Sequence, residues 1–213
     1  MDVLVLLSAL VLGYLLGSLN TSVIIGKFYG KDIRNHGSKS AGLTNTLRVL
    51  GKPAAVCVLA GDILKGIAAC VLGLALGFSF YSGEAGTVLL TAGTGAVIGH
   101  NWPLYFGFKG GKGVLTAVSV LFMANWVIAL VCLGFFFLIV ALTRYVSLGS
   151  ICAAILFAGV SFIPVFGGSP YFYIFALFIM LMIVFRHINN IKRLLAGTEN
   201  KLMVKDYFSG KGE

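Results

Sequence analysis

Long apolar runs dominate the sequence and leave few folds open to it. They cover roughly residues 3–25, 54–80, 86–106, 113–142, 146–165 and 171–185. A helix that crosses a bilayer needs about 20 consecutive apolar residues, and most of the runs are that long. Hydrophobic residues make up 59% of the 213-residue chain and charged residues 11%, which is more apolar surface than a soluble domain of this size can bury. The sequence therefore predicts an all-α, polytopic membrane protein.

The positions of Lys and Arg indicate how many helices these runs form. The polar loop 27–52 holds six basic residues, so we place it in the cytoplasm, where Lys and Arg accumulate. A single helix over 113–142 would give six spans and put Arg144 and the basic C-terminal end outside, against this rule. A break at Met123–Asn125, with Asn125 as a helix N-cap, gives seven spans. The N-terminus then lies outside, the C-terminus lies in the cytoplasm, and every Lys or Arg lies at or near the cytoplasmic side.

The net charge of +9 follows mostly from this topology and does not indicate a nucleic-acid partner. Anionic substrates or anionic lipid headgroups would match the remaining positive charge. We find no internal repeat, and we expect one domain over residues 1–200 followed by a short solvated tail over residues 201–213. The last apolar run is short, so we expect its helix to continue past Arg186. The sequence does not indicate an oligomeric state.

Two features inside the apolar runs predict helix packing rather than chemistry. The segments Gly13–Gly17 and Gly95–Gly99 each begin and end with glycine, and such stripes of small residues let membrane helices approach closely. Asp62 and Lys65 are three residues apart and share one helix face. Because charges inside a membrane are costly, we expect a structural ion pair near the cytoplasmic end, with Lys65 snorkelling toward the surface.

The first candidate site is the loop 31–48, which is rich in glycine, hydroxyl, amide and basic residues. Its second half, Leu43–Leu50, has enough aliphatic residues to form a short helix. Ser38 or Ser40 near the N-terminus of that helix, with Arg48 close by, would hold a phosphate well. The alternative interpretation is an ordinary solvated cytoplasmic loop.

The second candidate site is the basic, glycine-rich turn Gly107–Gly113, which lies between two apolar runs. Glycine has no Cβ and turns its backbone N–H groups toward a ligand at little cost. The N–H groups of Gly110 and Gly111, beside Lys109 and Lys112, are suited to bind an anion, most often a phosphate. The turn does not match the Walker A pattern Gly-x-x-x-x-Gly-Lys-Ser/Thr. The alternative is a positive-inside turn flanked by aromatic interface anchors.

The third candidate site joins the segments Arg144–Ser147 and Arg186–Arg193. Both lie at cytoplasmic helix ends in the seven-span topology. His187 and Asn190 are three residues apart, so on a helix they share a face. Each segment alone is typical of a positive-inside flank, but the convergence of three polar clusters on one membrane face favours a functional site.

Across nearly its whole length the chain resembles the bacterial integral-membrane glycerol-3-phosphate acyltransferases that use acyl-phosphate donors, the PlsY family. The first matching motif is Gly17-Ser18, Asp32-x-Arg34, Gly37-Ser38, Gly42, Thr44-Asn45 and Arg48. The second is Gly99-His100-x-x-Pro103 with Phe108-Lys109-Gly110-Gly111-Lys112. The third is Arg144-x-x-Ser147, Arg186-His187-x-x-Asn190-Ile191 and Arg193-Leu194-Leu195-x-Gly197.

The resemblance implies a seven-helix enzyme of the bacterial plasma (inner) membrane with its site at the cytoplasmic face. The implied reaction transfers a fatty acyl group from acyl-phosphate to sn-glycerol 3-phosphate. It yields 1-acyl-glycerol 3-phosphate (lysophosphatidic acid) and phosphate, the first acylation of phospholipid biosynthesis, and it implies no cofactor. The residues implied to position the reacting groups are Lys109, Ser147, His187 and Asn190. Those implied to bind substrate phosphate are Ser38, Thr44, Asn45, Arg48, His100, Gly110, Gly111 and Lys112.

The chain departs from the family's usual first motif, Gly-Ser-Gly-Asn-x-Gly-Ala-Thr-Asn, at three positions. Lys39, Ser40 and Leu43 replace the second Gly, the first Asn and the Ala. We keep the reaction class and expect that these residues lower the activity or alter the substrate.

No metal site and no protein base emerges from the sequence. The four cysteines lie singly inside apolar runs and are better explained as packing residues than as ligands or disulfide partners. The His-x-x-x-x-Asp pair of many acyltransferases is absent after His36, His100 and His187. Because an acyl-phosphate has a good leaving group, we expect catalysis by proximity and by charge stabilisation from Lys and Arg. A substrate phosphate would accept the proton of the attacking hydroxyl.

Two other classes of function were weighed against the enzyme. A transporter or channel for phosphate or organophosphate would use the basic clusters as one mouth of its pathway. Such a pathway needs polar residues toward the outer face, and the third to seventh predicted helices have hydroxyls but no charges there. A structural scaffold does not explain three glycine-and-base clusters on one face. Turnover by detergent-purified protein, without a membrane barrier, would separate the enzyme from the transporter.

Overall fold

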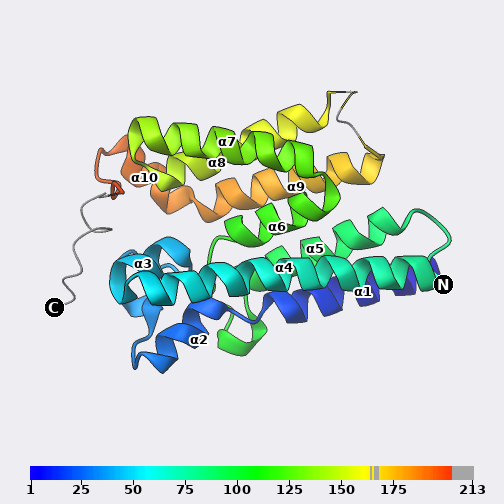
Figure 1. Ribbon diagram of the computed structural model, residues 1–213, viewed down its shortest axis with the longest axis horizontal. Coiled ribbons are helices and arrows are strands. Elements are labelled where there is room, and N and C mark those ends of the chain that lie inside the picture. Colours follow the sequence, from blue (N-terminus) through cyan, green and yellow to red (C-terminus); the bar gives the residue numbers. More distant parts are fainter. Residues whose placement is uncertain (164, 166–167, 203–213) are drawn as a thin grey trace. The chain divides into compact units, whose positions relative to one another are not determined.

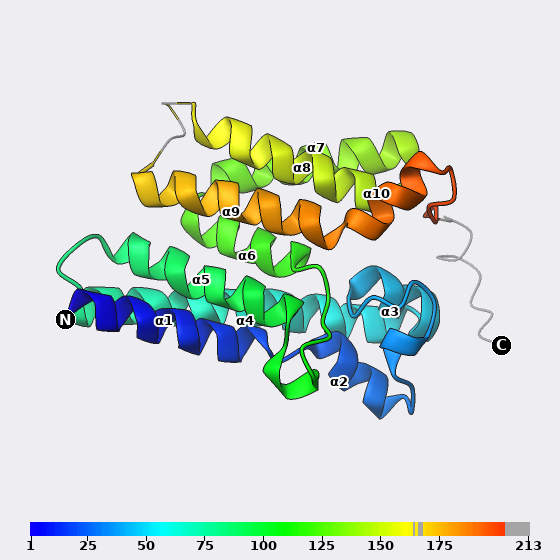
Figure 2. The same ribbon diagram turned by 180° about the vertical axis from the view of Figure 1, so that it is seen from behind.

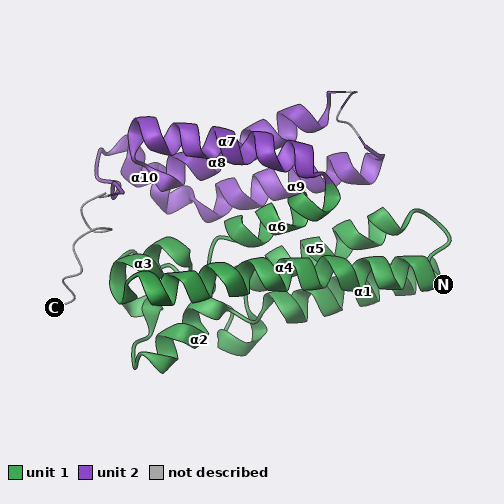
Figure 3. Cartoon of the chain, in the orientation of Figure 1, with its two compact units in different colours: residues 1–124, 211–213 green, residues 125–210 purple. Residues whose placement is uncertain are grey.

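The computed structural model is helical over its described residues, which are 1–163, 165 and 168–202 (Figure 1). It divides into two compact units, residues 1–124 and, as far as they are described, residues 125–202 (Figure 3). The predicted single domain over residues 1–200 remains a prediction.

The predicted helices are present in both units. Those of the first unit are α1 (Asp2–Gly17), α2 (Thr21–Phe28), α3 (Leu43–Leu50), α4 (Lys52–Phe80), α5 (Ala85–Asn101) and α6 (Val114–Ala124), with 3₁₀ turns η1 (Ile33–Asn35) and η2 (Leu104–Phe106). Those of the second unit are α7 (Trp126–Thr143), α8 (Val146–Ser161), α9 (Pro170–Arg186) and α10 (Ile188–Leu195). The short helix expected over Leu43–Leu50 is α3, so that prediction is confirmed.

The first apolar run forms two helices rather than one. α1 ends at Gly17 and α2 begins at Thr21. Asn20 is the N-cap of α2, and its Oδ1 accepts a hydrogen bond from the Val23 N–H at 3.1 Å. An Asn cap satisfies a backbone donor that would otherwise lack a partner, so it favours a new helix start at this point. The sequence analysis predicted one continuous apolar run here and did not predict this cap.

The predicted break at Met123–Asn125 is confirmed. α6 ends at Ala124, α7 begins at Trp126, and Asn125 is the N-cap between them. Its Oδ1 accepts a hydrogen bond from the Ile128 N–H at 3.1 Å. The predicted continuation past Arg186 takes the form of a separate helix, α10, which is bent by 58° from α9.

The number of membrane spans is settled only in part. Three described helical segments are long and apolar enough to cross a membrane, namely 2–28, 52–80 and 126–143, and the bent pair α9–α10 would make a fourth. α6 and α8 are apolar but shorter. The seven-span topology and its orientation therefore remain predictions.

Two glycine stripes hold α1 against α5, as expected, and the two helices run side by side (Figures 1 and 2). A Cβ added to Gly13 would lie 2.0 Å from the Ala92 carbonyl oxygen. A Cβ added to Gly95 would lie 2.2 Å from the Leu10 carbonyl oxygen. The backbones of the two helices are therefore in direct contact, which only glycine allows at these positions.

The predicted ion pair in α4 is present, but the predicted snorkelling of Lys65 is wrong. Lys65 Nζ lies 2.8 Å from Asp62 Oδ1, and the two side chains are 5% and 1% exposed. Nζ also donates a hydrogen bond to the Leu19 carbonyl oxygen at 3.2 Å. Partners inside the protein thus replace the solvent that a snorkelling lysine would reach.

The start of the predicted tail belongs to the second unit and contacts the turn between α7 and α8. The Leu202 N–H donates to the Arg144 carbonyl oxygen at 2.7 Å, and Lys201 Nζ lies 5.5 Å from the centre of the Tyr145 ring. The rest of the predicted tail, residues 203–213, lies outside the described residues.

We expect Gly95→Ala to lower the Tm of the detergent-solubilised protein by about 4 °C or more, because the new methyl group would overlap a backbone carbonyl of α1. Gly134→Ala in α7 is the matched control, since an added Cβ there meets no atom within 4 Å. Thermal unfolding followed by tryptophan fluorescence measures both. Equal Tm values for the two variants would contradict the packing described for α1 and α5.

Candidate functional site

The loop before α3 is held in place by one buried amide, Asn45. Its Nδ2 lies 3.0 Å from each of three carbonyl oxygens, those of Ile33, His36 and Ser40. Its Oδ1 accepts a hydrogen bond from the Ser38 N–H at 2.8 Å. The sequence assigned Asn45 to substrate binding, and the structure gives its side chain the role of fixing the backbone around Ser38.

Arg34 connects this loop to the glycine loop, residues Gly107–Gly113. Its Nη1 donates to the carbonyl oxygens of Phe106 at 2.7 Å and Lys109 at 3.3 Å. Asp32 orients the guanidinium group, with Oδ1 2.9 Å from Nε and Oδ2 2.8 Å from Nη2. The hydrogen bonds from Arg34 lower the pKa of Asp32 to about 2, so this pair stays charged at neutral pH.

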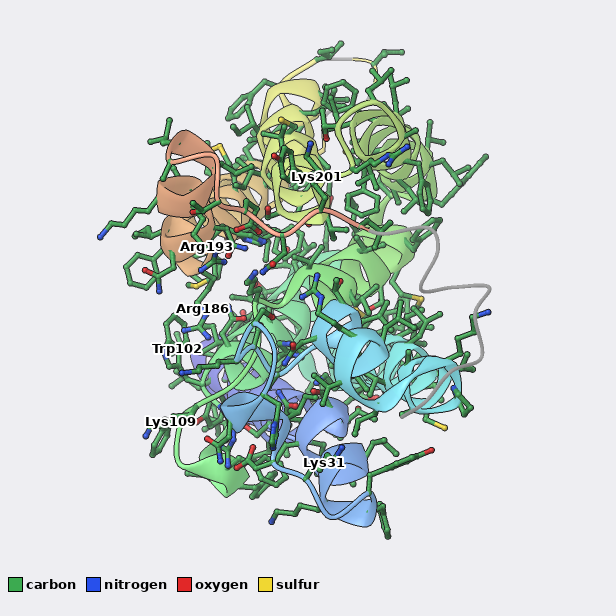
Figure 4. All side chains as sticks on the ribbon, turned by 90° about the vertical axis from the view of Figure 1, so that its left-hand side faces the viewer. Lys31, Trp102, Lys109, Arg186, Arg193 and Lys201 are labelled. Atoms are coloured by element: carbon green, nitrogen blue, oxygen red, sulfur yellow. The ribbon has the colours of Figure 1, made fainter. Side chains whose placement is uncertain are left out.

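The glycine loop requires glycine because of its backbone conformation. Gly107 and Gly113 have φ angles of 67° and 73°, in the left-handed region that side chains disfavour. Within the loop, Lys109 is exposed and Lys112 is half-buried. Figure 4 shows Lys109 at the edge of the first unit, pointing away from its helices.

The middle of the glycine loop lies against two other backbone segments. A Cβ added to Gly110 would lie 2.1 Å from the His100 carbonyl oxygen. A Cβ added to Gly111 would lie 2.2 Å from both the Ala41 carbonyl oxygen and His100 Nε2. The glycine loop, the end of α5 and the loop before α3 therefore meet at Gly111. The Gly111 N–H, predicted to bind an anion, instead donates to the His100 carbonyl oxygen at 3.1 Å.

The remaining predicted phosphate-binding residues of the first unit lie on or beside α3. Ser38 and Thr44 are half-buried, and Arg48 is exposed. Thr44 and Arg48 are four residues apart, so they share a face of this helix. No side chain caps the N-terminus of α3, where Gly42 is the N-cap. Hydroxyl, guanidinium and helix N–H groups are the donors that a phosphate binds.

Lys39 has a φ angle of 57°. Its position in the motif is the one at which the family usually has glycine. A side chain in this left-handed conformation costs about 1–2 kcal/mol. The departure from the motif therefore places a strained residue in the loop.

In the second unit a carboxylate that the sequence analysis missed brings two predicted residues together. Glu199 Oε1 accepts hydrogen bonds from Ser147 Oγ at 2.9 Å and Asn190 Nδ2 at 2.6 Å. Its Oε2 accepts one from Arg193 Nε at 2.7 Å. Burial opposes ionisation of Glu199, but these hydrogen bonds outweigh it and lower its pKa. Glu199 lies after α10 and joins Asn190 and Arg193 of that helix to Ser147 of α8, which is 52 residues away in the sequence.

His187 lies at the bend between α9 and α10 and is buried. Its Nδ1 lies 2.8 Å from the Ile183 carbonyl oxygen. A carbonyl only accepts hydrogen bonds, so Nδ1 carries a proton, and this contact fixes the orientation of the ring.

Comparison with known proteins gives a consistent result. A family model described as glycerol-3-phosphate acyltransferase matches residues 7–197. The chain is 48% identical over 201 residues to the glycerol-3-phosphate acyltransferase of Halalkalibacterium halodurans, covering 91% of this chain and 94% of that one. It is 42% identical over 193 residues to the enzyme of the same name from Thermoanaerobacter pseudethanolicus, covering 90% and 93% of the two chains.

Two crystal structures of PlsY, an integral membrane glycerol 3-phosphate acyltransferase, are also similar. Its glycerol 3-phosphate form has a TM-score of 0.85 and 37% identity, covering 96% of this chain and 99% of that one. Its lysophosphatidic acid form has a TM-score of 0.78 and 38% identity, covering 95% and 97%.

We expect Glu199→Gln to lower the Tm at pH 7, because the amide loses the charge of a carboxylate that accepts three hydrogen bonds. Since folding lowers the pKa of Glu199, its stabilisation is present above the unfolded value of 4.5 and is lost as the pH falls through the folded value. The difference in Tm between variant and parent should therefore shrink below about pH 4.5. Thermal unfolding between neutral and acidic pH measures this, with the exposed Glu84→Gln as control. A difference independent of pH would argue against an ionised Glu199.

We expect Lys39→Gly to raise the Tm by about 1–3 °C, because glycine adopts a positive φ without steric strain. Lys31→Gly is the matched control, since Lys31 is an exposed lysine of the same loop that lacks a positive φ. The control should not raise the Tm. A lower Tm for Lys39→Gly would show that the lysine side chain itself stabilises the loop.

Proposed function

The chain belongs to the glycerol-3-phosphate acyltransferase family, and from this premise we propose that it transfers a fatty acyl group from acyl-phosphate to sn-glycerol 3-phosphate. The products are 1-acyl-glycerol 3-phosphate and inorganic phosphate. The reaction is the first acylation of phospholipid biosynthesis. The enzyme crosses the bacterial plasma membrane seven times, with its site at the cytoplasmic face.

One observation carries this proposal, the locked glycine loop that presents Lys109. Arg34 hydrogen-bonds to the carbonyl oxygens of Phe106 and Lys109, so the N–H groups of the same peptide units, those of Gly107 and Gly110, point away from Arg34. Gly110 and Gly111 allow the loop to lie directly on neighbouring backbone. Donors fixed before the substrate arrives stabilise developing charge without reorganisation, which is the main requirement of phosphate chemistry.

The ligands of the similar PlsY structures support the proposal that glycerol 3-phosphate is the acyl acceptor. Those structures are of a glycerol 3-phosphate form and a lysophosphatidic acid form, which correspond to the acceptor and the acylated product of this reaction. Both molecules carry a phosphate monoester. The cations and hydroxyls on the loops of this chain, Lys109, Lys112, Arg48, Ser38 and Thr44, are suited to hold that group.

The reaction needs no acyl-enzyme. The sn-1 hydroxyl oxygen of glycerol 3-phosphate attacks the acyl carbonyl carbon, the bond from this carbon to the phosphate oxygen breaks, and phosphate leaves. A phosphate oxygen of a substrate takes the hydroxyl proton. The Lys109 ammonium stabilises the negative charge that develops on the oxygens.

The second unit contributes three proposed positioning residues. The Ser147 hydroxyl donates a hydrogen bond to Glu199, and this bond fixes the rotamer of the serine. The partner of the hydroxyl is thus a carboxylate and not a histidine that would activate the serine as a nucleophile. Asn190 is held by the same carboxylate oxygen. His187 is fixed by the Ile183 carbonyl oxygen. Ordered side chains of this kind lower the entropy that the reacting groups lose in the transition state.

We expect the detergent-purified protein to release phosphate from palmitoyl-phosphate only when glycerol 3-phosphate is present. Lys109→Ala should lower kcat/KM by about 100-fold, since it removes one charged donor. Lys52→Ala, at the exposed start of α4, is the control and should leave the rate unchanged. Phosphate release and lysophosphatidic acid formation are measured together.

Two outcomes would contradict the proposal. Acyl transfer from palmitoyl-CoA but not from palmitoyl-phosphate would refute the donor. Binding of glycerol 3-phosphate without any acyl transfer would favour the transport of organophosphates instead.

A further inference from the structure

Lys65 is surrounded by acceptors from three parts of the first unit. Besides Asp62 Oδ1 at 2.8 Å and the Leu19 carbonyl oxygen at 3.2 Å, His100 Nδ1 lies 2.9 Å from its Nζ. Nζ forms an ion pair with Asp62 and lies within hydrogen-bond distance of the Leu19 carbonyl oxygen and of His100 Nδ1. The contacts connect α4 to the α1–α2 junction, where Leu19 lies, and to the end of α5, where His100 lies.

This arrangement fixes the orientation of the His100 ring. Nδ1 is the ring nitrogen that contacts Nζ of Lys65. Nδ1 also lies 3.6 Å from Asp62 Oδ1. The contacts of Nδ1 with Lys65 and Asp62 therefore orient the ring, and they also fix the direction in which Nε2 points.

The Nε2 edge faces the point where the two candidate phosphate-binding loops meet. The position of a Cβ on Gly111 is 2.2 Å from Nε2 and 2.2 Å from the Ala41 carbonyl oxygen. The Gly111 N–H also donates to the His100 carbonyl oxygen at 3.1 Å. His100 thus contacts the glycine loop through both its ring and its backbone.

A buried charged cluster needs an explanation, because it is an inefficient way to stabilise a fold. Desolvation of two charges offsets most of their attraction, and apolar side chains of similar size often stabilise equally well. Such a cluster does, however, impose one geometry, because each N–H and each acceptor must find its partner. Here the cluster determines how the His100 ring meets the backbone at Gly111.

We propose that Asp62, Lys65 and His100 form a positioning set for the phosphate-binding loops. Asp62 and Lys65 fix the ring of His100, and the ring fixes the approach of Gly111 to Ala41. The set acts through the loops, and in this proposal that role takes the place of the direct phosphate contact predicted for His100. This inference rests on the proposed function in one respect, the binding of glycerol 3-phosphate by these loops.

The test is a double-mutant cycle of Lys65→Met and His100→Asn. The first variant removes the ammonium group that orients the ring, and the second keeps an amide near the position of Nδ1 but removes Nε2. We expect each to raise the KM for glycerol 3-phosphate by about tenfold and to change kcat by less than about threefold. The KM of the double variant should be no higher than that of the single variant with the higher KM, because both substitutions break the same connection.

Three controls keep the result specific. Lys52→Met removes an exposed lysine from the same helix and should leave KM unchanged. Asp62→Asn with Lys65→Met leaves no unpaired buried charge, so it replaces Lys65→Met if that variant does not fold. Calorimetric titration with glycerol 3-phosphate reports the same loss of affinity whichever acyl donor the enzyme uses, which separates this inference from the donor assignment.

Three results would overturn the inference. A KM for Lys65→Met within about twofold of the parent would show that the ammonium group does not act on the loops. Additive effects in the double variant would show that His100 binds substrate independently of Lys65. A fall in kcat with KM unchanged would place the set in the reaction step rather than in phosphate binding.

Discussion

A bilayer offers no water to polar groups, and most features of this chain follow from that constraint. Backbone groups must pair within the chain, which restricts the apolar runs to helices. Lipid also removes the hydrophobic force between helices, so α1 and α5 associate by close packing of glycine against backbone. A charge in an apolar run needs partners from the protein, and Lys65 finds them in Asp62, Leu19 and His100. The buried contacts of Lys65 in the first unit are thus a consequence of the lipid that surrounds the protein.

Within this frame, buried and half-buried polar side chains hold the loops, and exposed cations lie on the surface. Asn45 and Arg34 use their side-chain donors on loop backbone. Arg48 and Lys109 are exposed. A loop that became ordered only on binding would lose affinity to the entropy of ordering. The amide contacts of Asn45 and the guanidinium contacts of Arg34 order the loops in advance and so lower that cost for any ligand that binds them.

Features that depend on nearby residues could be predicted from the sequence. The break at Asn125, the short helix α3 and the two glycine stripes were predicted because capping, periodicity and residue size act over a few positions. Features that depend on distant partners could not. Glu199 is 52 residues from Ser147, and Lys65 is 35 residues from His100. The role of each follows only from the fold that brings the partners together, and so the sequence assigned snorkelling to Lys65 and no role to Glu199.

The hydrogen bonds that hold the loop before α3 do not use the side chains of the three residues that depart from the usual first motif. Lys39 is exposed and adopts the positive φ that glycine favours, so its effect is on loop strain. Ser40 contributes its carbonyl oxygen to Asn45, and any residue supplies that atom. Leu43 is the first residue of α3 and is half-buried. Since the hydrogen bonds of Asn45 to this loop are made to main-chain atoms, the loop keeps its shape and Ser38 its position while the side chains at these three places vary.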